Sequence, residues 1–205
     1  MNYTTLATKE SITKTIEALG KNGTEACVVE NEGEALEMIK KFIPQGVSVM
    51  NGSSRTLEEI GFVEYLKSGQ HGWNNLHEVI VNEKDPAIQS KLHKQATLSD
   101  YYVGSVHALS ETGEYVIASN SGSQLPNIVF SSPNLIFVVG AQKIVPTLYD
   151  TMKRLEEYVI PLENEHMKQK YGVGTMLSKV VQFRRENPIM GRKVRMILVN
   201  KVLGF

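Results

Sequence analysis

The sequence contains an unbroken apolar run, Leu135-Ile136-Phe137-Val138-Val139. A strand that is apolar on both faces is typical of the centre of a parallel sheet covered by helices on both sides. Short apolar segments alternate with amphipathic segments on either side of this run, and that alternation indicates an α/β protein. We therefore predict a mostly parallel sheet with residues 135–139 as a central strand.

The same patterns predict the neighbouring elements. Other strands are expected at residues 26–29, 46–50, 79–81, 101–106 and 115–118. Helices are expected at residues 12–19, 34–43, 56–67, 125–130 and 146–158, and another begins at Asp85-Pro86 and turns Ile88, Leu92 and Ala96 to the core. Residues 180–184 and 194–199 flank Asn187-Pro188 and Gly191, which predicts an antiparallel hairpin that closes the sheet.

Composition and charge exclude several classes of protein. The chain has 205 residues, 22 basic and 22 acidic, and 41% of them are hydrophobic. This length suits one domain over residues 1–205, and zero net charge argues against a nucleic-acid partner, because phosphate binding needs a basic surface. The apolar run at residues 135–139 is far shorter than the ~20 residues that span a bilayer, and the first residues lack a signal-peptide pattern. We expect a cytoplasmic protein with no membrane partner.

The cysteine and histidine residues limit metal chemistry. Cys27 is the only cysteine of the sequence, which excludes an internal disulfide, a cysteine-ligated iron–sulfur cluster and a cysteine-type zinc site. Cys27 lies in an apolar segment and is interpreted as a small buried hydrophobic residue. The five histidines lack H-x-x-x-H and H-E-x-x-H spacing, so we expect no metal, and no cofactor follows from the sequence.

Polar loops follow the predicted strands at their carboxyl ends, where ligands of open α/β sheets bind. The first loop contains Gly52, Ser53, Ser54, Arg55 and Thr56. Gly52 permits a tight turn, hydroxyl and helix N–H groups attract an anion, and Arg55 adds a charged fork for phosphate or carboxylate. The alternative is structural, because Thr56 and Glu59 have the spacing of a capping box.

Two further segments follow strands. The loop of Ser121, Gly122, Ser123 and Gln124 comes after residues 115–118. It can surround a polar ligand with backbone N–H groups, or it is a solvated turn. Gly140, Gln142 and Lys143 come directly after the central strand and lie at the edge where a ligand binds. A lysine at such a position is more often exposed than catalytic.

Glu111 lies in the turn Ser110-Glu111-Thr112-Gly113-Glu114, between two apolar strands. A carboxylate at the end of a core strand can act as a base, a nucleophile or a hydrogen-bond acceptor, whereas a plain hairpin with Gly113 needs no function. The nearby His107 is either a neighbour of such a site or a structural histidine.

Several segments together resemble the LUD domain, a family named for lactate utilisation that includes lactate utilisation proteins B and C. They are residues 52–61, 104–108, 111–113, 118–124, 138–145 and 194–205. The resemblance implies a three-layer α/β/α sandwich similar to phosphosugar isomerases and CoA-transferases. Glu111 looks like the CoA-transferase glutamate that attacks a thioester or acyl group, so the resemblance implies a catalytic role for it. The B-type proteins carry cysteine motifs for iron–sulfur clusters, so this chain more closely resembles lactate utilisation protein C and the short stand-alone members.

Three functional hypotheses follow. The first is a protein that binds a small anionic molecule (a phosphate, a carboxylate or a CoA-type ligand) in lactate or related organic-acid metabolism. The second is a non-enzymatic accessory or regulatory subunit of a redox complex, with a protein partner in organic-acid oxidation. The third is an acyl- or CoA-transferase that uses Glu111.

Overall fold

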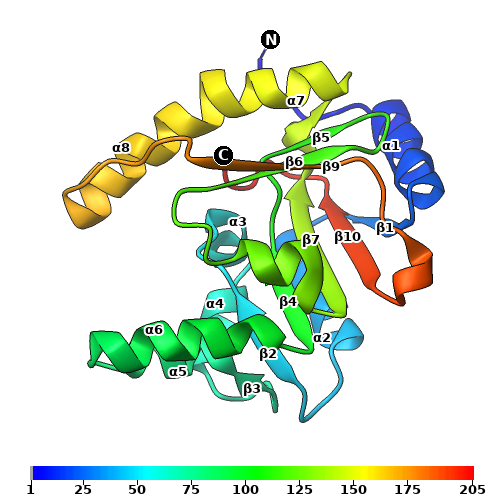
Figure 1. Cartoon of the computed structure of the whole chain (residues 1–205). Helices are drawn as coiled ribbons and strands as arrows, with labels where there is room; N and C mark the ends of the chain where they lie inside the picture. Colours follow the sequence, from blue (N-terminus) through cyan, green and yellow to red (C-terminus); the bar gives the residue numbers. More distant parts are fainter. Residues whose placement is uncertain (1) are drawn as a thin grey trace.

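The main sheet has six parallel strands. The computed structural model describes residues 2–205. The strands lie in the order β1-β10-β7-β4-β2-β3 (Figure 1). Their bounds are β1 (Thr24–Val29), β2 (Ser48–Asn51), β3 (Asn74–Asn75), β4 (Tyr101–Gly104), β7 (Asn134–Gly140) and β10 (Lys193–Val199). The apolar run at residues 135–139 forms most of β7, which has two strands or more on either side, so its central position is confirmed.

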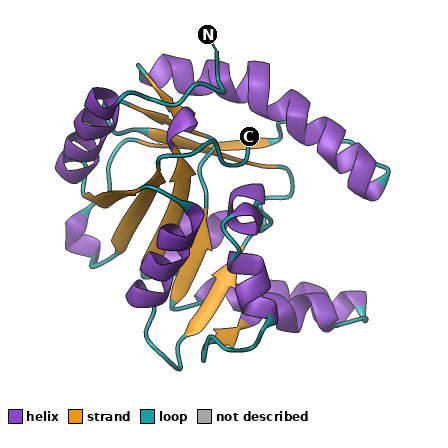
Figure 2. Ribbon diagram, turned by 180° about the vertical axis from the view of Figure 1, so that it is seen from behind, coloured by secondary structure: helices purple, strands orange, loops and turns teal. Residues whose placement is uncertain are grey.

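Helices cover both faces of this sheet (Figure 2). One face packs against α2 (Glu32–Phe42), α3 (Arg55–Glu59) and α4 (Phe62–Lys67), and the other packs against α1 (Lys9–Lys21) and α5 (Leu76–Asn82). Ile136 and Val138 of β7 belong to the first cluster, while Leu135, Phe137 and Val139 belong to the second. This alternation follows from the two-residue period of a strand, and the α/β fold with a mostly parallel sheet is confirmed.

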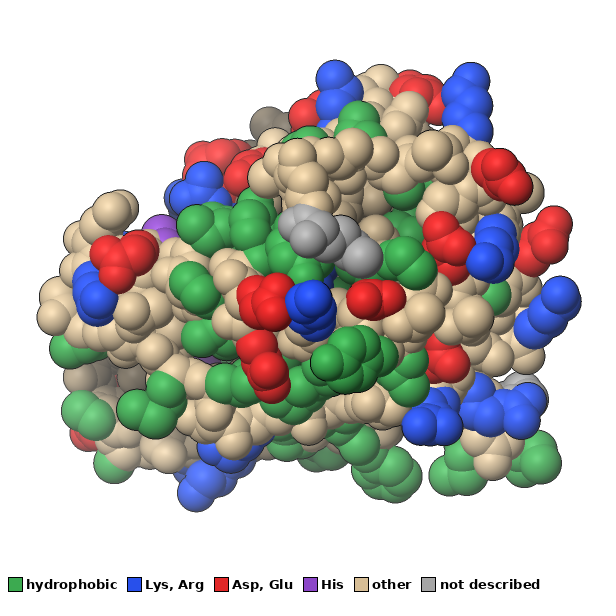
Figure 3. Space-filling view, turned by 90° about the horizontal axis from the view of Figure 1, so that it is seen from above, with side chains coloured by type: hydrophobic (Ala, Val, Ile, Leu, Met, Phe, Trp, Pro, Cys, Tyr) green, Lys and Arg blue, Asp and Glu red, His purple; other side chains and the backbone are tan. Residues whose placement is uncertain are grey.

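A second sheet lies against the main core. Its order is β8 (Ile144–Val145), β5 (Ala108–Ser110), β6 (Tyr115–Ser119) and β9 (Lys179–Phe183). One side of it joins the main core through Leu109 and Ile117. The other side is covered by a long helical segment made of α7 (Leu148–Arg154), a π-helical turn (Leu155–Val159) and α8 (Ile160–Tyr171). Acidic and basic side chains are interspersed on this outer face (Figure 3).

The remaining helical segments are short or lie at the periphery. They are α6 (Pro86–Gln95), a π-helical turn (Asn127–Ser131) and the 3-10 turns Ala96–Leu98, Ala141–Lys143 and Pro188–Met190. Asp85 caps α6, as predicted, by accepting hydrogen bonds from the Ala87 and Ile88 N–H groups. Ile88 is nevertheless 47% exposed, so its predicted place in the core is wrong. None of the helices formed by residues 2–205 combines the length and the hydrophobicity that crossing a membrane requires.

The predicted C-terminal hairpin does not form. β9 pairs antiparallel with β6, and β10 pairs parallel with both β1 and β7, so the two segments belong to different sheets. The burial of β10 explains its position, because residues 196–199 are buried on both faces. Such a strand is stabilised in the middle of a covered sheet rather than at its edge.

Two local predictions are also wrong. Residues 79–81 belong to α5 rather than to a strand: Asn75 caps this helix, and Leu76 and Ile80 face the core while Val79 is 53% exposed. The helix expected at residues 56–67 is split into α3 and α4, because Gly61 takes a left-handed conformation (φ 77°). Both cases follow from local geometry that an apolar pattern alone does not reveal.

Candidate functional site

Lys143 lies at the carboxyl edge of the main sheet and is only 4% exposed. Its Nζ donates hydrogen bonds to Thr56 Oγ1 (3.0 Å), Ser105 Oγ (3.2 Å) and the Val106 carbonyl oxygen (3.3 Å). These partners follow β2 and β4, while Lys143 follows β7, so the ends of three neighbouring strands meet at one amine. The expectation that this lysine is exposed is wrong, because the 3-10 turn after β7 is buried throughout.

Arg154 is a second buried cation near Lys143. It lies in α7, is 0% exposed, and donates through Nη1 to the carbonyl oxygens of His107 and Phe205. Its Nε and Nη2 atoms have no hydrogen-bond partner. Burial lowers the pKa of Arg154 to about 10.

The electrostatics of this edge disfavour a second positive charge. Burial and the positive charge of Arg154 lower the pKa of Lys143 to about 7, and attraction to Glu59 opposes this shift. Within residues 2–205, neither Lys143 nor Arg154 forms an ion pair with a carboxylate. The edge therefore holds buried positive charge without a direct counter-charge.

His107 is a neutral neighbour of both cations. Its Nδ1 accepts a hydrogen bond from the Ala118 N–H (3.1 Å), so the neutral ring carries its proton on Nε2. Burial, together with repulsion from Lys143 and Arg154, lowers the pKa of His107 to about 3. The ring consequently adds no charge to the site at neutral pH.

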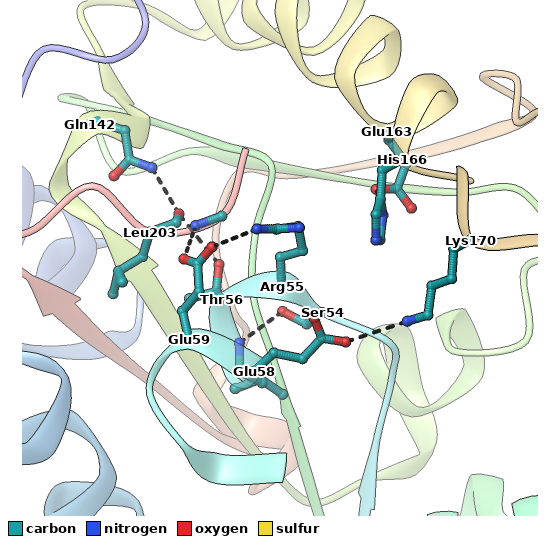
Figure 4. Close-up of polar contacts among 12 residues, drawn as sticks. Ser54, Arg55, Thr56, Glu58, Glu59, Gln142, Glu163, His166, Lys170 and Leu203 are labelled. Carbon is teal, nitrogen blue, oxygen red and sulfur yellow. Dashed lines mark hydrogen bonds and ion pairs between the residues drawn. The ribbon is translucent and has the colours of Figure 1, made fainter. Parts of the chain in front are cut away.

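Residues 203–205 lie across this edge (Figure 4). The Leu203 carbonyl oxygen accepts a hydrogen bond from Gln142 Nε2 (2.8 Å), and the Gly204 N–H donates to Glu59 Oε2 (2.7 Å). A Cβ at Gly204, whose φ is 62°, would lie 2.5 Å from Thr56 Oγ1 and 3.2 Å from Lys143 Nζ. The backbone of Gly204 therefore covers the buried amine, and only a residue without a side chain fits there.

Only some residues of the first predicted loop, residues 52–56, contact the buried lysine. Thr56 is buried and contacts Lys143, whereas Ser53 and Arg55 are exposed. Arg55 pairs with Glu59 (3.4 Å), and its guanidinium carbon lies 5.4 Å from the centre of the Phe205 ring.

Ser54, rather than Thr56, caps α3. The Ser54 hydroxyl accepts a hydrogen bond from the Leu57 N–H (3.4 Å). The capping box predicted for Thr56 and Glu59 is wrong, because the Thr56 hydroxyl faces Lys143 and the Glu59 carboxylate binds the Gly204 N–H.

The first loop and the loop of residues 121–124 meet at Tyr102. The Tyr102 hydroxyl donates to Gln124 Oε1 (2.9 Å), and a Cβ at Gly52 would lie 2.4 Å from that same oxygen. Gly140 lies directly against the side chain of Gln142, because a Cβ added at Gly140 would be 2.2 Å from Gln142 Oε1.

Residues 121–123 of the second of these loops bond to one another and to Ser119. Ser121 Oγ donates to Ser123 Oγ (3.0 Å), and the Gly122 N–H donates to Ser119 Oγ (2.9 Å). Both Ser121 and Ser123 are exposed, and no hydrogen bond joins them to Lys143.

Glu111 lies apart from the buried cations. Its carboxylate accepts hydrogen bonds from Lys14 Nζ (2.8 Å) and Ser11 Oγ (2.6 Å) of α1, and these two contacts lower the pKa of Glu111. His107 precedes β5 and Glu111 follows it, so at about 3.3 Å per residue roughly 13 Å of strand separates them. The structure does not bring Glu111 to Lys143, and the catalytic role of Glu111 stays a prediction.

A model of the LUD domain family matches residues 12–179, which is more than half of the chain. The chain belongs to the LUD domain family. This LUD domain is similar in structure to a DUF162 family protein from Deinococcus radiodurans, with a TM-score of 0.60 and 13% sequence identity over 96% of this chain and 100% of that chain. At this identity the likeness shows the fold alone. No curated protein matches the sequence.

Sequence reasoning missed several residues at this edge of the LUD domain. Arg154 comes three residues after buried Thr151, so helical spacing places both on one side of the helix and offers a signal for a buried arginine. Ser105 directly follows a buried strand, where polar residues of a site are expected. The contact of Gly204 with Lys143 has no local signal, because 61 residues separate them in the sequence.

Proposed function

We propose that this LUD domain binds a small organic acid at the carboxyl edge of the main sheet, in lactate or related organic-acid metabolism. The observation that carries the proposal is the pair of buried cations, Lys143 and Arg154, without a carboxylate counter-charge among the described residues. Burial of an uncompensated charge is costly, and an anion that binds beside it recovers part of that cost.

The donors at this edge favour a carboxylate. Arg154 keeps Nε and Nη2 without partners, and a guanidinium binds a carboxylate through two parallel hydrogen bonds. The hydroxyl groups of Thr56 and Ser105 lie within hydrogen-bond distance of the Lys143 amine and can also bond to a hydroxyl group of the acid. A 2-hydroxy acid fits this combination of groups, and the association of the family with lactate utilisation supports the same class.

Binding requires a shift of residues 203–205. The carbonyl oxygens of Leu203 and Phe205 accept hydrogen bonds from Gln142 and Arg154, so they occupy donors that a ligand would use. We propose that an acid replaces these backbone oxygens. Gly52 and Gln124 lie against each other and Gln124 bonds to Tyr102, and we propose that they contact the additional groups of a larger phosphate or CoA-type ligand.

The test is thermal unfolding against a panel of ligands: lactate and other 2-hydroxy acids, sugar phosphates and CoA thioesters. A ligand at 100 times its dissociation constant adds about 2.7 kcal/mol, which raises the midpoint of a chain of this size by roughly 5–10 °C. We expect such a shift with small carboxylates. In Lys143→Met we expect the affinity for the same ligand to fall at least tenfold, so the shift at equal ligand concentration should be smaller.

The matched control is Lys67→Met, which removes an exposed lysine that pairs with Glu64 on α4. This variant should bind like the wild type. The proposal would be contradicted if no ligand of the panel raised the unfolding midpoint, or if the shift in Lys143→Met equalled that of the wild type. Either result would favour the accessory-subunit hypothesis, which is tested by co-purification with a protein partner.

A further inference from the structure

We propose that Lys143 is a reactive amine that forms an imine with the carbonyl carbon of a small 2-oxo acid bound at this edge. The inference rests on the proposed function and deepens it, because it names a carbonyl-bearing acid as the ligand class and adds a covalent step.

The hydrogen-bond partners of Lys143 suit both the charged and the neutral amine. Two of the three are hydroxyl groups, those of Thr56 and Ser105, and the third is the Val106 carbonyl oxygen. A hydroxyl group can accept a hydrogen bond from an ammonium or donate one to the lone pair of a neutral amine. An ionised carboxylate only accepts hydrogen bonds and so suits the charged amine alone; exposed Lys67 has such a partner in Glu64 (2.6 Å), and Lys143 has none among residues 2–205.

The surroundings favour the nucleophilic form. Arg154 is buried nearby, and Lys143 itself is 4% exposed, so proton loss relieves both repulsion and desolvation. With a pKa of about 7, a large fraction of the amine is free at neutral pH, whereas an ordinary lysine with a pKa of ~10.4 has roughly 0.1% or less. Desolvation beside another cation is a recognised way to activate a lysine for attack on a carbonyl.

Arg154 supplies the complementary group for the acid. Its unpartnered Nε and Nη2 donors are buried, and the carboxylate of a 2-oxo acid is one carbon away from the carbonyl that Lys143 attacks. The positive charge of Arg154 acts on the Lys143 amine, and in this proposal the two groups contact one bound 2-oxo acid, its carboxylate on Arg154 and its carbonyl at the amine.

Access to the amine depends on Gly204. Its backbone lies directly over Nζ, held by the hydrogen bond from the Gly204 N–H to Glu59 and by the contacts of Leu203 and Phe205. The reaction takes place when residues 203–205 move away, so a change that loosens this segment should accelerate it.

The step balances without an oxidant or reductant. The lone pair of the neutral Lys143 amine attacks the carbonyl carbon, a C–N bond forms, and the carbonyl π electrons move to oxygen. A proton passes from nitrogen to that oxygen. The product is a carbinolamine, and the remaining N–H proton then passes to its hydroxyl group as the C–O bond breaks. Water leaves, the electrons of that N–H bond become available to nitrogen, and the C=N bond of the imine remains.

The experiment traps this imine. Full-length protein is incubated at pH 7 with pyruvate and sodium cyanoborohydride, which delivers hydride to the C=N bond and leaves a stable secondary amine. Peptide mapping by mass spectrometry should find Lys143 heavier by the mass of pyruvic acid less one oxygen atom. We expect Lys143 to be labelled at least about tenfold faster than exposed Lys67, since a large fraction of the Lys143 amine is free at this pH.

Two further variants make the result decisive. Phe205→Ala removes the ring that contacts Arg55 and should accelerate labelling of Lys143. Lys143→Arg keeps a cation and should carry no label at this position, while labelling of Lys67 is unchanged. Absence of selective labelling at Lys143 in both the wild type and Phe205→Ala overturns the inference.

Lactate separates this inference from the proposed function, because it has no ketone to form an imine. A thermal shift with lactate but no trapped pyruvate overturns the imine and leaves acid binding in place. No shift with either acid and no label overturns both.

Discussion

The buried amine of Lys143 has a direct consequence for stability. Its pKa is about 7 in the folded protein and ~10.4 in an unfolded chain, so the unfolded state binds more protons between these two values. The free energy of unfolding must therefore rise with pH across this window as far as this group is concerned. Below pH 7 both states are protonated, and the folded state carries the full cost of the buried charge.

A comparison of the wild type with Lys143→Met isolates this effect. We expect the difference in unfolding free energy, wild type minus variant, to increase between pH 7 and pH 9 by up to about 1.4 kcal/mol per pH unit. Urea denaturation at several pH values measures it. A difference that does not change with pH would show that the amine keeps its proton in the folded state.

At the scale of elements, residues 203–205 complete the edge on which β2, β4 and β7 end. Leu203 is 3% exposed and packs in the same cluster as Leu57 of α3 and Ile136 of β7. Gly204 then passes over Lys143 with a positive φ. In this segment Leu203 therefore belongs to the core, while the next residue, Gly204, covers the Lys143 amine.

Gly204→Ala tests how tightly this segment is held. The new Cβ would lie 2.5 Å from Thr56 Oγ1, in addition to the strain of a positive φ. Gly172→Ala is the matched control, because Gly172 has φ 73° but a Cβ added there would have no atom within 4 Å. We expect Gly204→Ala to cost about 1–2 kcal/mol more than the control, since overpacking adds to the strain.

Hydrogen exchange gives a local measure of the same change. The Gly204 N–H is bonded to Glu59 in the wild type and should exchange faster in Gly204→Ala. Equal exchange rates and equal stability losses in the two glycine variants would mean that the segment adapts without leaving Thr56 and Lys143.

At the scale of the whole molecule, the order of the strands depends on β10. This strand comes last in the sequence and yet lies between β1 and β7, to both of which it is bonded along its length. Without it β1 has no partner in the main sheet. The main sheet therefore cannot be completed until residues 193–199 are in place, and contacts of such high sequence separation predict slow folding.

Removal of β10 should abolish cooperative folding. We expect a fragment that ends at residue 187 to show no sharp thermal transition by circular dichroism. The full-length variant Ile197→Ala, which only truncates a fully buried side chain, should remain cooperative and lose about 2–5 kcal/mol. A cooperative transition in the fragment would show that the second sheet and the remaining strands form a stable unit without β10.

Local patterns in the sequence determined the class of this fold. The apolar run at residues 135–139 identified β7 as a central strand, and Asp85-Pro86 marked the start of α6, because burial on both faces and helix capping act over a few neighbouring residues. The same kind of reasoning placed Thr56 and Lys143 at strand ends, where α/β proteins bind ligands.

Only the tertiary structure decided the partners of those residues. The insertion of β10, the burial of Lys143, its pairing with neutral groups and the passage of Gly204 over its amine all depend on contacts between segments that are far apart in the sequence. A side chain's charge state depends on what surrounds it in space, and a single chain segment does not contain that information. The sequence alone therefore indicated that Thr56 and Lys143 lie at the carboxyl edge. The packing of distant segments brought Arg154 and Gly204 to them and decided which side chains are buried and what chemistry they can perform.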